Sequence, residues 1–227
     1  MPFHPDQYTQ YQHWRYEDIP DCIWPSDNPY DIPLLRPDLQ GNALDLPVVA
    51  WGSVRRSHRM LGSWHFYVDD YRFSRLWTDP SPILNSGCAT IIEPNFSITD
   101  QTPTALALYR LYQKRWLART WQELGRIRVF VDLNIGARHQ ELALLGVPDG
   151  WRAYATRGYT DKLDLTDAEY AAACRHRGSE DVLFVVVGGG HAVEQHARSR
   201  GWMWIPEQRT LARERHTVAR EHAKERG

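Results

Sequence analysis

The sequence predicts an α/β protein built on a mostly parallel sheet of about six to seven strands with crossover helices. Short apolar runs alternate along the chain with helical segments, which is the pattern of βαβ units. Several of these runs are almost continuously apolar, as strands covered on both faces require. Spacing does not separate an open doubly wound sheet from an incomplete (β/α) barrel, so both architectures stay open.

Each element follows from a local pattern. The runs expected to form strands are 46–53, 64–68, 89–92, 127–131, 152–156, 182–187 and 202–205. A short helix is expected after the second run, a long one ending at Gly125 after the third, and further helices at 140–145, 167–176 and 191–200. Thr102 with Pro103 has the form of a cap followed by a first-turn proline. Thr166 with Glu169 matches a capping box.

Length and composition indicate one ordinary globular domain. The chain has 227 residues, of which 42% are hydrophobic and 24% charged, and a chain of this size buries a full core. We expect an extended N-terminal segment rich in proline and aromatic residues (1–45) packed on the domain, a single α/β domain (46–208) and a polar, basic C-terminal helix or tail (209–227).

Cysteine usage and hydropathy indicate a cytoplasmic protein. No apolar run approaches the roughly 18 residues of a membrane span, so no membrane association is expected. Cys22, Cys88 and Cys174 are odd in number and form no CxxC pair, which favours reduced, structural thiols. The net charge of -1 gives no general positive field. Nucleic-acid binding would therefore need a local patch of the Arg-rich surface or the basic tail.

Acidic residues follow three consecutive predicted strands. Asp70, Glu93 and Asp132 would meet at one rim if these strands are neighbours, because parallel strands end at the same edge of a sheet. Three carboxylates there predict a catalytic acid/base cluster, with a divalent metal as a candidate cofactor. The alternative is structural, since Asp and Asn are common caps and turn residues where a strand leads into a helix.

Two further features at strand ends suit an anion. Gly188, Gly189 and Gly190 precede a helix and let backbone N–H groups approach a phosphate at its positive end. Arg157 can pair with the same anion. Tight packing of strand against helix explains the glycines equally well, and Arg157 suits an ordinary salt bridge as well.

The stretch WHFYVDDYRFSRLW (64–77), followed by IIEPNFSI, YATRGY and VVVGGG, resembles the family called domain of unknown function 4417, which occurs in bacteria, archaea, phages and mobile elements. The resemblance covers roughly 46–208. In that family's pattern an acid stands at the position of Asn95 and none at that of Glu93, whereas Ser97 and Arg157 agree. The resemblance therefore favours a polar binding rim that includes Asn95 and Ser97 over a fixed acid cluster.

Three functions remain in view. The first is a nucleic-acid-associated accessory protein of a phage or mobile element. The second is an enzyme acting on a nucleotide or phosphate-bearing small molecule at the strand-end rim, with Asp70, Glu93 and Asp132 as reacting groups. The third is a structural module that binds a protein partner. Substrate and oligomeric state stay open.

Overall fold

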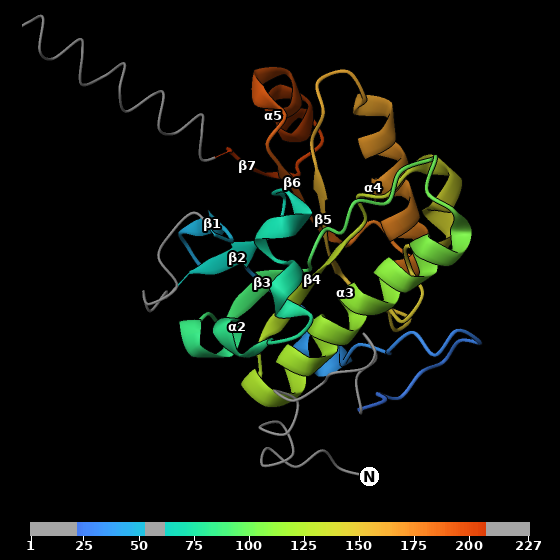
Figure 1. Ribbon diagram of the computed structural model, residues 1–227. Coiled ribbons are helices and arrows are strands. Elements are labelled where there is room, and N and C mark those ends of the chain that lie inside the picture. The colour runs from blue at the N-terminus through green and yellow to red at the C-terminus, as the bar shows by residue number, and fades with distance from the viewer. Residues whose placement is uncertain (1–21, 53–61, 208–227) are drawn as a thin grey trace, which may run out of the picture.

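The computed structural model describes residues 22–52 and 62–207 (Figure 1). Within them lies a seven-stranded sheet in which all neighbouring strands run parallel. Each strand lies close to the run predicted for it. The strands are β1 (Val48–Ala50), β2 (Ser63–His65), β3 (Thr90–Ile92), β4 (Arg128–Asp132), β5 (Ala153–Arg157), β6 (Leu183–Val187) and β7 (Met203–Ile205).

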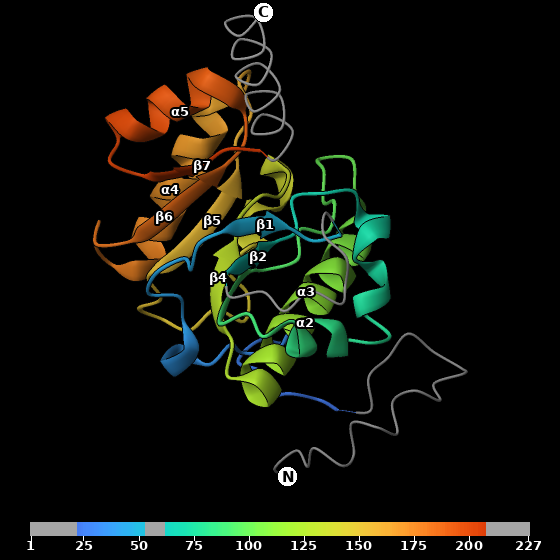
Figure 2. The same cartoon turned by 90° about the vertical axis from the view of Figure 1, so that its left-hand side faces the viewer.

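The order of strands across the sheet is the order in the sequence, from β1 to β7. A doubly wound sheet needs a reversal of strand order, and this sheet has none. Right-handed crossovers that always step in the same direction place the helices on one face. The sheet curls until it is nearly closed and barrel-like, with the helices outside (Figure 2). The predicted parallel α/β class is confirmed, and the incomplete barrel is the architecture observed.

Three longer helices cover the outer face (Figure 1). They are α3 (Thr104–Gly125), α4 (Leu163–Arg177) and α5 (Gly190–Ser199). The segment after β2 forms two 3-10 turns, η3 (Asp70–Arg72) and η4 (Ser74–Leu76), and then the short helix α2 (Ser81–Ser86). The weak helix expected at 140–145 is the 3-10 turn η5 (Ala137–Leu142). A further 3-10 turn, η2 (Pro37–Leu39), precedes the sheet.

Two helix starts differ from the predicted caps. Thr102 does not cap α3; its Oγ1 accepts the Thr99 N–H at 2.9 Å. Helix α4 begins at Leu163, a turn earlier than expected, so that Thr166 and Glu169 lie inside it. Glu169 is 1% exposed and accepts a hydrogen bond from Thr156 Oγ1 of β5 at 2.6 Å. The predicted capping box is therefore wrong, because Glu169 packs against the sheet and binds Thr156 instead of a backbone N–H at the start of the helix.

Alternation along the strands divides side chains between the helical layer and the barrel interior. After β2, Phe66 is stacked on Trp121 of α3, with ring centroids 5.8 Å apart. On β5, the Tyr154 hydroxyl lies 2.9 Å from His176 Nδ1 of α4. Because successive strand residues point to opposite faces, His65 and Arg157 point into the barrel.

The described part of the N-terminal segment packs on α3 and then enters the sheet. Trp24 Nε1 donates to Thr120 Oγ1 of α3 at 3.0 Å. Gln40 bridges to Val129 of β4 in parallel, and its Oε1 accepts the Arg152 N–H at 2.9 Å. The segment thus fills the gap between the amino ends of β4 and β5.

The rest of the predicted N-terminal segment, 1–21, and the predicted C-terminal helix or tail, 209–227, lie outside the described residues. The proposed division of the chain at residues 45 and 208 stays a prediction. In the part of the chain that the structure describes, no helix combines the length and apolarity needed to cross a membrane.

Candidate functional site

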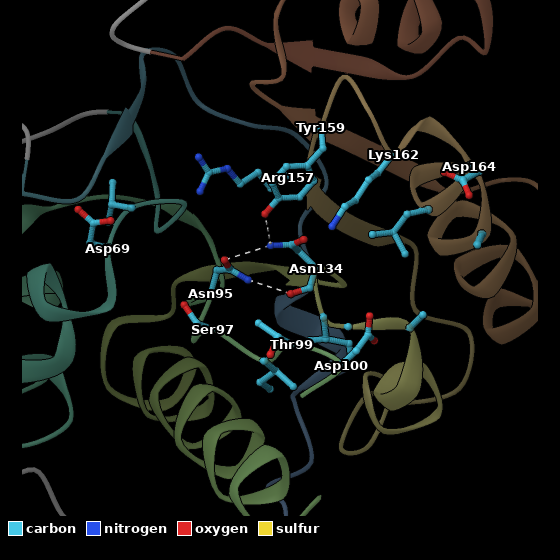
Figure 3. Close-up of a pocket in the computed structure, with 17 residues that line it drawn as sticks. Asp69, Asn95, Ser97, Thr99, Asp100, Asn134, Arg157, Tyr159, Lys162 and Asp164 are labelled. Atoms are coloured by element: carbon cyan, nitrogen blue, oxygen red, sulfur yellow. Dashed lines mark hydrogen bonds between the residues drawn. The ribbon is translucent and has the colours of Figure 1, made fainter. Parts of the chain in front are cut away.

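A pocket of about 540 Å³ lies at the carboxyl ends of β2 to β5 (Figure 3). This is where parallel α/β proteins place ligands, because the loops that follow the strands converge there. The loop after each of these strands supplies part of the wall. The polar side chains that line it are Asp69, Asn95, Ser97, Thr99, Asp100, Asn134, Arg157, Tyr159, Lys162 and Asp164.

The β5 side of the pocket carries two cations around one aromatic ring. The Arg157 guanidinium lies 5.5 Å and Lys162 Nζ 5.7 Å from the centroid of the Tyr159 ring. In Figure 3 the two basic side chains lie on either side of Tyr159. Arg157 also lies 3.6 Å from the Glu207 carboxylate, with both side chains more than a third exposed, so this ion pair is weak. Residues 22–52 and 62–207 supply no acidic partner within 4 Å of Lys162 Nζ, which leaves that cation available to a ligand.

Asp132, at the end of β4, lies behind the pocket wall and is fully buried. Four donors satisfy its two oxygens. Oδ1 accepts from the Tyr67 hydroxyl at 3.0 Å and the Asn134 N–H at 3.1 Å. Oδ2 accepts from Lys114 Nζ at 2.8 Å and Asn95 Nδ2 at 3.0 Å. Burial, with Asp132 adding to it, holds the pKa of the Tyr67 hydroxyl well above its usual range, so Tyr67 stays a donor.

Glu93, at the end of β3, is also fully buried and pairs with Arg115 of α3. Its Oε2 accepts the Asp132 N–H at 3.0 Å, while its Oε1 has no partner among the described residues. Two acids and two bases thus form a buried network between the sheet and α3. Such pairs keep buried charges compensated, and breaking one leaves a costly unpaired charge.

Asp70, at the start of η3, lies at the rim of the site. Its Oδ1 accepts from Ser97 Oγ at 2.8 Å and its Oδ2 from the Ser97 N–H at 3.1 Å. Arg110 of α3 donates to the carbonyl of the same Ser97. These contacts tie the β2 and β3 loops to α3 and hold Ser97 in the pocket wall.

The three glycines after β6 lie outside the pocket lining. Gly188, Gly189 and Gly190 have φ values of 79°, 81° and 73°, which favour glycine. A Cβ on Gly189 would lie 2.8 Å from the backbone of Gly158, and the Gly189 carbonyl accepts from Thr160 Oγ1 at 2.6 Å. The run therefore permits close packing of the β6 loop on the β5 loop.

The structure brings part of the predicted set together. Asn95, Ser97 and Arg157 line the pocket, Glu93 and Asp132 stand behind it, and Asp70 supports its edge. Within the described ranges, no group of three or more His, Cys, Asp or Glu side chains is placed to hold a metal ion. The catalytic role of Asp70, Glu93 and Asp132 and the anion-binding role of the glycines stay predictions.

Sequence reasoning missed Tyr159 and Lys162 as site residues. Both follow the β5 run directly, in RGYTDK, so the rule that placed Arg157 at the rim would have reached them. It also missed Lys114 and Arg115. A basic pair in the middle of a long helix is usually a solvated face, and only the fold shows the acids that hold it.

Two buried titratable groups lie close to the pocket. Burial, with a smaller effect from the Arg157 cation, lowers the pKa of His65 to about 4. Burial raises the pKa of Glu169 to about 8, against the lowering effect of the Thr156 hydrogen bond. At neutral pH His65 is therefore uncharged and adds no positive charge to the β5 side, while Glu169 is mostly protonated and so does not offset that charge.

The fold and the pocket together define a parallel, barrel-like α/β protein with a polar pocket at the strand ends. The chain belongs to the family described as Domain of unknown function (DUF4417), whose model matches residues 24–165. The match starts and ends earlier than the resemblance over 46–208 implied. It includes every strand that supplies the pocket and all but one of the residues that line it.

Two phage proteins are similar to part of the chain. The Gene 1 protein of Mycobacterium phage D29 is 34% identical over 107 residues, which cover 45% of this chain and 38% of the phage protein. The Gene 1 protein of Mycobacterium phage L5 is 31% identical over 105 residues, which cover 44% of each. The chain thus spans less than half the length of these curated relatives. No solved structure matches it. The predicted family and phage context are confirmed.

Proposed function

We propose that the pocket binds the phosphate group of a nucleotide. The observation that carries this proposal is the pair of cations, Arg157 and Lys162, that flank Tyr159 in a pocket of about 540 Å³. That volume suits a ligand larger than a simple anion. Arginine and lysine in a partly enclosed site hold phosphate through charge-assisted hydrogen bonds.

The acidic groups of the pocket suit the rest of a nucleotide. Three of the described acids line the pocket. Asp69 and Asp164 lie toward opposite edges of the close-up, away from the Tyr159 hydroxyl (Figure 3), and Asp100 accepts the Arg138 N–H through Oδ1 at 3.0 Å. Carboxylates repel a phosphate but accept hydrogen bonds from sugar hydroxyls or base amino groups. A ligand with one anionic end and several neutral donors fits this mixture better than inorganic phosphate does.

The end of a nucleic-acid strand is the second source of such a ligand. Tyr71 is 71% exposed, with the Arg72 guanidinium 5.9 Å from its ring centroid. Both follow Asp70, which holds Ser97 in the pocket wall. A strand leaving the pocket would therefore meet an aromatic ring for stacking and an arginine for a phosphate. We place the protein in the cytoplasm, where its three cysteines would stay reduced.

Calorimetry with the four nucleoside 5′-monophosphates, the matching nucleosides and a hexathymidylate with and without a 5′-phosphate tests this proposal. We expect the monophosphates to bind and the nucleosides not to bind. We expect the hexathymidylate with a 5′-phosphate to bind more tightly than the one that carries only phosphodiesters, and all binding to be weaker at 200 mM than at 50 mM salt. Arg157→Gln and Lys162→Gln should each weaken binding about tenfold or more. Arg175→Gln is the matched control, because it removes an exposed charge in the last turn of α4, at the opposite end of the barrel.

Absence of binding at low salt, or equal binding by all three variants, would overturn the proposal. Turnover of a bound monophosphate would show in the same samples by phosphate release. Release that Asp132→Asn abolishes in a folded protein would favour the enzyme over the binding protein. Preference for the phosphorylated oligonucleotide over free monophosphates would favour the strand end.

A further inference from the structure

A chain of hydrogen bonds links a buried ion pair on α3 to the pocket. It begins at Lys114, which is 1% exposed and donates to Asp132 at 2.8 Å. It passes from Asp132 to Asn95 at 3.0 Å, from Asn95 to Asn134 at 3.2 Å and from Asn134 to the Tyr159 hydroxyl at 3.5 Å. Figure 3 shows the last two of these links reaching into the site.

The orientation of the Asn95 amide determines which groups donate and which accept along these hydrogen bonds. Its Nδ2 lies 3.0 Å from Asp132 Oδ2 and 3.0 Å from the Asn134 carbonyl oxygen. Both of those atoms only accept hydrogen bonds, because three other donors already bind the Asp132 carboxylate and a carbonyl has no proton. The amide nitrogen of Asn95 must therefore point at them. Its Oδ1 is left to accept.

The orientation of Asn95 in turn fixes the donor and acceptor roles of Asn134 and Tyr159. Asn95 Oδ1 needs a donor, and the Asn134 side chain supplies its Nδ2 at 3.2 Å. The second proton of that nitrogen points toward the Tyr159 oxygen at 3.5 Å. Tyr159 therefore accepts from Asn134. Its own O–H has no acceptor among the described residues, which leaves it to donate to a ligand.

We infer that the site recognises a terminal phosphate, a group with three unesterified oxygens, and that Asn95, Asn134 and Asp132 are positioning residues that keep the Tyr159 hydroxyl a donor to it. This inference rests on the proposed function. Arg157 and Lys162 only donate, so Tyr159 makes a third donor around one ligand group. A terminal phosphate offers an oxygen to each, whereas a phosphodiester has two free oxygens.

The test compares each nucleoside 5′-monophosphate with its 3′,5′-cyclic counterpart, which keeps base and sugar but is a diester. We expect the wild-type protein to bind the monophosphate about tenfold more tightly. Tyr159→Phe keeps the ring between the two cations and removes only the hydroxyl. It should weaken monophosphate binding about tenfold and reduce the preference over the cyclic compound.

A double-mutant cycle then separates positioning from simple support. Asn134→Ala should weaken binding about threefold, and the double variant with Tyr159→Phe should bind no more weakly than Tyr159→Phe alone, since both act through one hydroxyl. Additive losses would overturn the positioning role. Equal binding of monophosphate and cyclic compound would overturn recognition of a terminal phosphate.

Lys162→Gln distinguishes failure of this inference from failure of the proposed function. Weak binding by Lys162→Gln together with unchanged binding by Tyr159→Phe would reject the inference and leave phosphate binding standing. Unchanged binding by Lys162→Gln and Arg157→Gln would reject both. Thermal melts of each variant, run without ligand, confirm that a lost affinity does not reflect an unfolded protein.

Discussion

Replacing Glu169 with glutamine should stabilise the protein at neutral pH and have little effect at pH 5. Glu169 lies on α4 against β5, 1% exposed, with Oε2 bonded to Thr156 and Oε1 without a partner in the described part of the chain. Burial disfavours its charged form and raises its pKa from 4.5 to about 8. Glutamine has nearly the same shape, keeps an oxygen for Thr156 and never ionises.

The magnitude follows from that pKa. Between pH 4.5 and 8 the unfolded chain has released the proton and the folded protein has kept it. The contribution of Glu169 to the free energy of unfolding therefore falls as pH rises, by about 1.4 kcal/mol per pH unit. The span from pH 4.5 to 7 gives about 3 kcal/mol at pH 7, and Glu169→Gln should recover most of it.

Urea unfolding at pH 5, 6, 7 and 8, followed by tryptophan fluorescence, measures this difference. The variant and the wild-type protein should unfold at nearly the same urea concentration at pH 5 and diverge steadily above it. Glu180→Gln is the control, because that carboxylate is exposed and its loss should have no such pH dependence. A Glu169→Gln effect that stays constant from pH 5 to pH 8 would refute the argument.

Three further predictions concern the core and the buried network. Lys114→Met leaves the Asp132 carboxylate buried without its cationic partner and should lower the free energy of unfolding by about 3–5 kcal/mol. In urea unfolding, the double variant with Asp132→Asn should recover part of this loss, and a still lower stability would contradict this account. Phe66→Ala removes a ring that is fully buried and should lower the same quantity by about 3–5 kcal/mol, whereas a loss below 1 kcal/mol would mean that the site collapses around the gap. His65, whose pKa burial and the Arg157 cation lower to about 4, should show no titration of its ring protons by NMR between pH 7.5 and 5.5, and a midpoint near 6.5 would show that the ring is solvated. Because the folded form does not take up the proton that the unfolded chain binds, the contribution of His65 to the free energy of unfolding should fall as pH drops below 6.5, opposite in sign to that of Glu169.

The architecture was predictable where local pattern and burial agree. Runs such as Leu183–Val187 are apolar throughout because both faces of the sheet are covered, and each strand lies close to its predicted position. The direction in which the sheet winds was not predictable. Open and barrel-like sheets use the same alternation of strands and helices, and only contacts between distant segments separate them.

The location of the site could be predicted from the sequence better than the side chains that form it. Parallel strands end at one edge, so Asn95 and Arg157 could be assigned to a shared rim from the sequence. The spacing of Thr166 and Glu169 fits a capping box equally well whether Glu169 faces solvent or the sheet. The burial of Glu169 could therefore not be predicted from the sequence. The same holds for Lys114, whose acidic partner lies 18 residues away on a strand.

The insertion of Gln40 between β4 and β5 has a consequence for how the chain folds as it is synthesised. Its partners are the backbone of Val129 and the N–H of Arg152, which lies 112 positions further along. The amino ends of β4 and β5 therefore stay open until Arg152 has left the ribosome. Contacts of this range are slow to form because the intervening loop must close first. Gln40 can thus take its place in the barrel only once β4 and the start of β5 have been synthesised.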